Sequence, residues 1–206
     1  MTITNGLITA AEFAAYLGVN QPIDPTRSGQ WDDAITVASR WVEKYCGRQF
    51  HDSGAVDSAR YFDPMGLIVR IDDCRSITSV AVDAGDDGTH NTIVTDYQAL
   101  PPYGRDLRLG AVPYTELKAL SWTVWEYEND RLGSVKVTGL WGWSAVPDDV
   151  QRATAILAQD LLRDSESAFG GLAIAADGVV LGARIPARVI GLLTPYVRVE
   201  RTLGIA

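Results

Sequence analysis

The spacing of apolar residues along the chain changes twice, and this limits the folds that the chain can adopt. Up to Gly47, and again after Pro147, apolar residues recur every three to four positions, which is the period of a helix that buries one face. From Arg60 to Gly142 they fall in short runs of branched residues between turns, as in strands. The sequence therefore predicts an α+β fold, with a small antiparallel helical bundle, an inserted antiparallel β module and an extended C-terminal segment.

The N-terminal part predicts two helices. Thr9 and Glu12 have the spacing of a capping box, and Gly18 is placed to end the first helix. A loop with two prolines covers Asn20–Gly29, and a longer helix follows over Gln30–Cys46. The apolar stripe expected to be buried on this second helix comprises Trp31, Ile35, Ala38, Val42 and Tyr45.

The middle of the chain predicts at least three strands, at Leu67–Ile71, Ile77–Val82 and Ser134–Leu140. Turn residues separate them, including the acidic turn Asp83–Gly88. Four tryptophans lie in this region, at positions 122, 125, 141 and 143. We expect them to fill the core of a small sheet; a role at an interface is the alternative.

Helical periodicity returns at Pro147, which suits a first helical position, and Asp148 and Asp149 place negative charge at the positive end of the helix dipole. The expected buried stripe of this helix comprises Val150, Ala153, Ile156, Leu157 and Leu161.

The stretch Asp164–Gly182 is rich in Gly, Ala and Ser and has no clear period, so we expect it to be mobile or loosely packed until it meets a partner. A short helix is expected from Ile185–Pro186 to Leu193, stopped by Thr194–Pro195. The predicted organisation is thus residues 1–59 as the N-terminal bundle helices, 60–145 as the β module, and 146–206 as a bundle helix, a linker and a C-terminal docking arm.

The sequence contains no arrangement typical of a catalytic or metal site. His51 and His90 are the only histidines and lack paired ligand spacing, and Cys46 and Cys74 fit buried free thiols in a reducing compartment. The run Gly142–Val146 begins like a nucleophile elbow but lacks the closing glycine. The acidic turn lacks the ligand pattern of a calcium loop, although adventitious cation binding there stays open. We therefore expect no enzymatic activity, no cofactor and no metal.

Charge and hydropathy limit the partners. The chain has 18 Lys and Arg against 26 Asp and Glu, which gives a net charge of −8 without a basic cluster. A protein that grips DNA neutralises phosphates with clustered cations, so this chain is expected to let DNA pass without specific binding. No apolar run approaches the roughly 18 residues that span a bilayer, and Met1–Gly6 lacks the features of a signal peptide. We expect a protein made and used in a cytoplasm, with no membrane partner.

The order of elements resembles that of a known family. An N-terminal Leu-Ile-Thr-x-x-Glu-Phe helix, from Leu7 to Phe13, precedes a helix that ends in the run from Trp41 to Phe50. A β insertion then ends in Val135–Trp143 and leads into the helix start Val146–Val150. This arrangement is similar to the head-tail connector (adaptor) family of tailed phages, the group similar to the HK97 and SPP1 connector proteins. The larger β insertion departs from the smallest, nearly all-helical members.

The resemblance implies a structural virion protein, made in the host bacterial cytoplasm and located at the head-tail junction. It implies a homo-oligomeric ring, expected to be twelve-fold, that lies under the portal protein, extends the DNA channel and carries a stopper or tail-completion protein. It also implies that the C-terminal segment reaches the portal. Carried onto this chain, the expected partner interface comprises Ile185, Val189, Leu192, Leu193, Tyr196, Arg198 and Arg201.

Two alternatives stay open. The first is a stopper or tail-completion protein of the same particle, which would usually be barrel-like and lack the two N-terminal helices. The second is a small hydrolase, for which a deep polar pocket with convergent Asp side chains would be the distinguishing feature.

Overall fold

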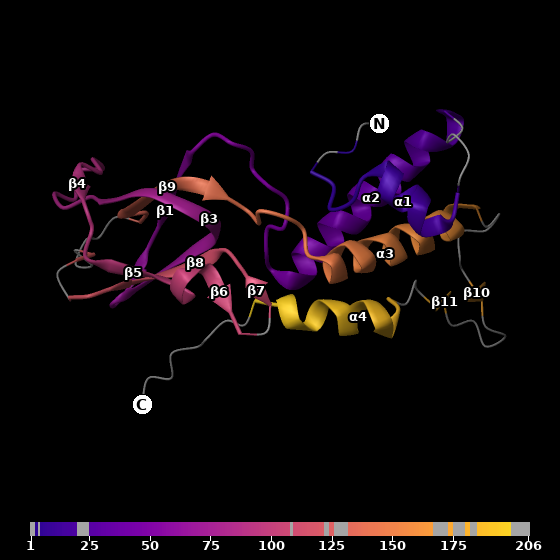
Figure 1. Cartoon of the computed structure of the whole chain (residues 1–206). Coiled ribbons are helices and arrows are strands. Elements are labelled where there is room, and N and C mark those ends of the chain that lie inside the picture. The colour runs from indigo at the N-terminus through magenta and orange to yellow at the C-terminus, as the bar shows by residue number, and fades with distance from the viewer. Residues whose placement is uncertain are drawn as a thin grey trace. The chain divides into compact units, whose positions relative to one another are not determined.

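A computed structural model shows a mixed α+β protein, and the predicted fold class is confirmed (Figure 1). It describes residues 3, 5–19, 25–107, 109–121, 124–125, 132–166, 173–174, 180–181 and 185–198. The chain divides into two compact units: a helical unit of residues 1–48 and 146–206, and a β unit of residues 49–145.

The helical unit begins with α1 (Ala10–Leu17) and α2 (Pro25–Cys46). The capping box is present, because Thr9 Oγ1 accepts from the Glu12 amide and the Glu12 carboxylate accepts from the Thr9 amide. Gly18 ends α1 with φ 70°, a left-handed conformation that favours glycine. The start of α2 differs from the prediction of Gln30, since a proline is well suited to the first turn of a helix and Pro25 begins this one.

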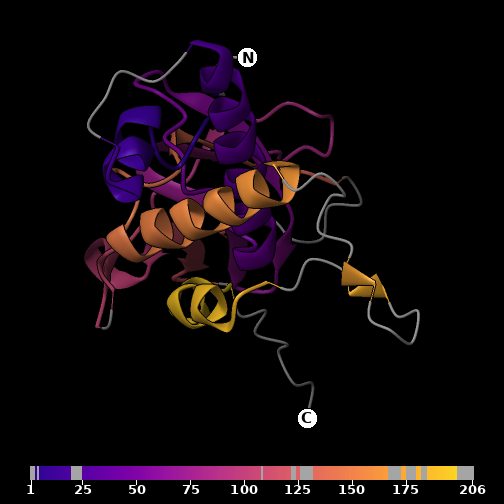
Figure 2. The ribbon, with the colours of Figure 1, turned by 90° about the vertical axis from the view of Figure 1, so that its right-hand side faces the viewer.

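The last two helices are α3 (Asp148–Glu166) and α4 (Ala187–Leu193), and a 3₁₀ turn, η2 (Thr194–Tyr196), follows α4. Helix α3 packs against α2 on one side and α4 on another, as both views show (Figures 1 and 2). Six consecutive residues of α3, positions 153–158, are buried, so α3 is the central helix of the unit. Helix α3 begins at Asp148, so Pro147 precedes the first helical position that was predicted for it. Its carbonyl accepts a hydrogen bond from the Gln151 amide.

The expected linker overlaps this helix, because α3 continues to Glu166. Two short strands, β10 (Ala173–Ile174) and β11 (Val180–Leu181), pair antiparallel within the linker. The other residues of Asp164–Gly182 lie outside the part of the chain that the structure describes, so its mobility stays a prediction.

The β unit is an antiparallel sheet in the order β1-β9-β3-β8-β5, with β2 and β4 pairing along β3. A separate two-stranded ribbon, β6–β7, follows the 3₁₀ turn η1 (Pro102–Gly104). The strands are β1 (Ser58–Phe62), β2 (Pro64–Met65), β3 (Ile68–Val82), β4 (Thr92–Ile93), β5 (Tyr97–Leu100), β6 (Arg105–Asp106), β7 (Gly110–Ala111), β8 (Tyr114–Ala119) and β9 (Val135–Trp141).

The two strands predicted at Leu67–Ile71 and Ile77–Val82 form one strand, β3, which pairs with β8 along its first part and with β9 along its second. Register shifts interrupt these pairings around Asp73 and between Ile77 and Ser79. A bulge lets a strand bend without ending, so the polar residues between the two apolar runs did not terminate the strand.

One face of this sheet forms the core of the β unit. Val135, Val137 and Trp141 of β9 are buried there at alternate positions, as the period of two predicts. Trp125 and Trp141 are buried in the core of the sheet, as predicted. Trp143 is buried beside Phe50 and lies outside that core cluster, and Trp122 lies outside the described residues. Trp141 donates from Nε1 to the Ser58 carbonyl at 2.9 Å, and the Arg60 guanidinium lies 4.4 Å from its ring.

Candidate interaction surface

The seven residues predicted as a partner interface fall into three groups. Val189 and Leu193 are fully buried and Tyr196 nearly so, inside the helical unit itself. Ile185, Leu192 and Arg198 are half-buried and therefore reach its surface. Arg201 lies outside the described residues.

Helix α4 is short, and its buried residues explain how it is held. A helix of seven residues is marginal alone, so its position depends on packing against α3. Val189 and Leu193, four residues apart, share the face that is buried. At about 1.5–3 kcal/mol for each large apolar side chain removed from water, the two anchor α4 in the unit.

The chain after α4 is tied back to the end of α2. The Arg198 amide donates to the Cys46 carbonyl at 2.8 Å, which satisfies one of the last acceptors of α2. Burial raises the pKa of Tyr196, and the negative charges of Asp149 and Asp148 raise it further. The phenol therefore stays protonated at neutral pH and serves as a packing group.

The outward side of α4 is small and basic. Ala187, Arg188 and Gly191 are exposed, and Ile190 is 39% exposed. Residues 184–206 contain four arginines and one glutamate, whereas the whole chain carries −8. Among the described residues of this segment, Arg188 is exposed and Arg198 half-buried, so both cations reach the surface beside Ile190.

A second surface was not predicted from the sequence. Tyr45, expected in the inward stripe of α2, is 37% exposed, and its ring stacks on Trp41 with centroids 5.1 Å apart. Val37, one turn before Trp41, is 51% exposed. We name these three residues the α2 ridge. Their spacing of four positions could have predicted this surface from the sequence, because it marks a second apolar stripe beside the buried one.

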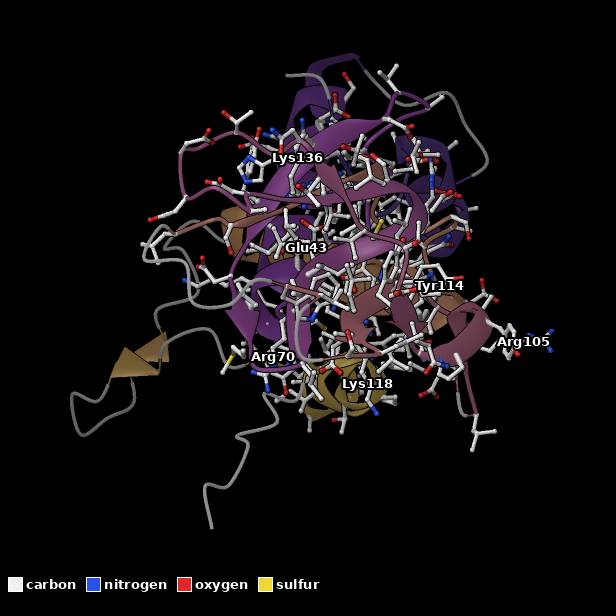
Figure 3. The ribbon with its side chains drawn as sticks, turned by 90° about the vertical axis from the view of Figure 1, so that its left-hand side faces the viewer. Glu43, Arg70, Arg105, Tyr114, Lys118 and Lys136 are labelled. Carbon is white, nitrogen blue, oxygen red and sulfur yellow. The ribbon has the colours of Figure 1, made fainter. Side chains whose placement is uncertain are left out.

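The charges of the β unit are mostly negative. This unit has fourteen acidic and eight basic residues. Arg70, Lys118 and Lys136 come from three different strands, and Arg105 points away from the β6–β7 ribbon (Figure 3). A protein that grips DNA neutralises phosphates with clustered cations, so the excess of acidic residues in this unit does not favour DNA binding.

The residues considered for chemistry have structural roles where they are described. The buried Asp83 carboxylate accepts from the amides of Asp87 and Gly88, which fixes the acidic turn. His90 pairs through Nε2 with the Gly133 carbonyl at 2.8 Å. Within the described ranges, no three His, Cys, Asp or Glu side chains gather in a group that could hold a metal ion.

Cys46 and Cys74 are both buried, which confirms the burial predicted for Cys46. Burial raises the pKa of Cys74 to about 11, so this thiol is protonated at neutral pH and is a poor nucleophile. Among the described helices, none combines the length and the apolar character that crossing a bilayer requires.

Comparison with known proteins gives a structural match. No protein-family model and no curated protein matches the chain. The fold is similar to that of a chain in a solved structure described as the neck of an empty GTA particle, computed with C6 symmetry. The TM-score is 0.55, the identity is 18%, and the match covers 99% of this chain and 95% of the other. At this identity the similarity shows a shared fold.

Proposed function

We propose that this chain is a structural protein of the neck of a phage-like particle, and more specifically a head-tail connector (adaptor) subunit. One observation carries the proposal: the fold matches a neck chain over 99% of this chain and 95% of the other, so both units take part in the match. The α1–α2 pair supports an adaptor over a stopper, which would usually be barrel-like without such helices.

The proposed assembly is a ring of copies under the portal protein. The matched neck was computed with sixfold symmetry, which is compatible with six or twelve copies around one axis. We propose the twelve-fold ring. Each copy brings a net charge of −8, and a wall of that sign would keep DNA from adhering as it passes through the channel.

The proposed contact with the portal is the outer side of the C-terminal region. Val189, Leu193 and Tyr196 would hold α4 and η2 on the helical unit, because these side chains are buried within it. Ile185, Leu192, Arg198 and Arg201 would then meet the partner. In this division of roles, the first set fixes the position of the second.

Electron microscopy of the purified full chain mixed with the portal protein of the same particle tests the proposal. We expect closed rings with a central channel, bound to one end of the portal. A double variant, Leu192→Asp with Arg198→Glu, is expected to reduce portal binding at least about tenfold, because it reverses a charge and places a carboxylate at an apolar contact. Its matched control is Leu132→Asp with Arg70→Glu in the β unit.

The outcomes separate the alternatives. Binding to a preformed adaptor ring instead of the portal would favour the stopper role. Failure to bind either would remove the neck assignment. Equal loss of portal binding in both double variants would remove the assignment of the C-terminal contact alone.

A further inference from the structure

We propose that the α2 ridge, Val37, Trp41 and Tyr45, binds a second copy of this chain in solution and forms the contact between neighbours in the ring. This inference rests on the proposed function, because a contact between neighbours in a ring requires that the chain forms one. The first step is that α2 carries apolar residues on two sides. Its inner stripe, Trp31, Ile35, Ala38, Val42 and Cys46, is already buried in the helical unit.

The outer stripe is made of residues that favour protein contacts. Trp and Tyr are enriched in the centres of interfaces, where each buries a large area at little cost in side-chain entropy. The stacking of Trp41 on Tyr45, with ring planes only 10° apart, holds both side chains in a defined position before any partner arrives. Such preorganisation reduces the cost of binding.

The charges around the ridge favour an acidic partner. Arg40 and Lys44 follow Val37 and Trp41 by three positions on α2, and Arg48 follows Tyr45 by three positions just beyond the end of the helix. The carboxylates of this part of the chain are Asp33 and Glu43. Arg40 and Glu43 pair across one turn at 3.1 Å. These five residues thus have a small excess of positive charge in a chain whose net charge is −8.

Two copies of an acidic chain repel each other over most of their surfaces. They can approach at lower cost where one copy presents a basic, apolar surface to the acidic remainder of the other. The ridge is such a surface, which makes a second copy the occupant that the charges support. DNA is a weaker candidate, since three cations beside two carboxylates neutralise few phosphates.

The contact must be heterologous to build a ring. A ridge that packed on the same ridge of its neighbour would close as a two-fold dimer, whereas contacts between different surfaces continue around an axis. The sixfold symmetry of the matched neck agrees with the heterologous arrangement.

The test is the self-association of the full chain, measured by sedimentation equilibrium from nanomolar to high micromolar concentrations. Val37→Glu places a carboxylate in the ridge at an exposed position, so the fold is expected to survive. We expect at least about tenfold weaker association. Val56→Glu, an identical change at an 80% exposed valine of the β unit, is the control and should leave association unchanged.

The inference would be overturned by a wild-type chain that stays monomeric, by association equal in the two variants, or by duplex DNA binding that Val37→Glu abolishes. Association that stops at dimers would also overturn it. If the neck assignment alone is wrong, Val37→Glu still weakens association, but the wild-type oligomers do not bind the portal. If this inference alone is wrong, Val37→Glu still forms rings that bind the portal.

Discussion

The two units of this chain depend on different kinds of contact. In the helical unit, the ends of α1 are satisfied by neighbours in sequence, with Thr9, Glu12 and Gly18 all within one short segment. In the β unit, buried polar groups bridge distant segments: the Asp73 carboxylate accepts from the Gln49 amide, and Trp141 donates to the Ser58 carbonyl. The ends of α1 are therefore specified locally, whereas the β unit requires the meeting of residues far apart in sequence.

The two units also differ in where their exposed apolar residues lie. In the helical unit, the exposed Val37 and Tyr45 lie on either side of the half-buried Trp41 on α2. Other exposed apolar residues of this unit are Val19, Leu161 and Ile190. In the β unit, the most exposed apolar side chains, Val56, Tyr103, Leu107 and Leu132, stand outside its long strands in different connecting segments. The helical unit also carries less net negative charge, with twelve acids against ten cations.

The largest effect on stability is expected at the core of the β unit. Replacing Trp141 with Ala removes a fully buried ring and its hydrogen bond to Ser58. We expect a loss of about 3–5 kcal/mol in the free energy of unfolding, measured by denaturant titration. Leu132→Ala, at a 90% exposed side chain, should change it by less than about 0.5 kcal/mol.

Hydrogen exchange of the Trp141→Ala variant shows where the stability is lost. Because Trp141 lies in β9, which pairs with β1 and β3, and in a core cluster that includes residues of β3, β8 and β9, faster exchange is expected in these strands, with α2 and α3 changing less. An equal loss of protection from exchange in both units would contradict the view that this long-range contact stabilises the β unit in particular.

The sequence predicted best what short-range patterns determine. The capping box, the glycine stop of α1 and the inward stripes of α2 and α3 all depend on residues within a few turns of one another. Tyr45 and Leu161, each at the end of a stripe and each 37% exposed, show the limit. Periodicity predicts which side of the helix a residue faces, but the extent of the neighbouring helix determines which residues on that side are buried.

Long-range contacts account for what the sequence did not predict. The predicted strands Leu67–Ile71 and Ile77–Val82 left Asp73 outside both, yet Asp73 is buried within β3, where its carboxylate accepts a hydrogen bond from the Gln49 amide. A local pattern cannot show that an amide 24 residues away will satisfy a buried carboxylate. The roles of the C-terminal residues were unpredictable for a similar reason, since α3 decides which side of α4 is buried.

A smaller effect is expected for the local contacts of the helical unit. Thr9→Ala removes the side-chain acceptor for the Glu12 amide and should cost about 1 kcal/mol of unfolding free energy. Glu12→Gln is the matched control, because glutamine retains the acceptor of the capping box and its effect should be smaller. Faster exchange confined to α1 would support local specification, and loss spread through the whole unit would contradict it.

The smallest expected effect concerns an exposed long-range pair of the β unit, Arg75 and Asp52. The hydrogen bond from Arg75 is the main reason that the pKa of Asp52 lies below its ordinary value of 3.8. A carboxyl group whose pKa is lower in the folded state stabilises the fold above the unfolded pKa, and this stabilisation is lost as the pH falls through the folded pKa.

Arg75→Gln should therefore lower the free energy of unfolding at neutral pH by no more than about 1 kcal/mol, because the Asp52 side chain is 46% exposed and solvent screens the pair. The difference from the wild type should shrink as the pH falls below about 4, where Asp52 begins to be protonated in the unfolded chain. Denaturant titrations of both proteins from neutral pH to the acid range measure it. A difference that grew toward low pH would show that Arg75 stabilises the unit through contacts other than the carboxylate, such as its bond to the Gly54 carbonyl.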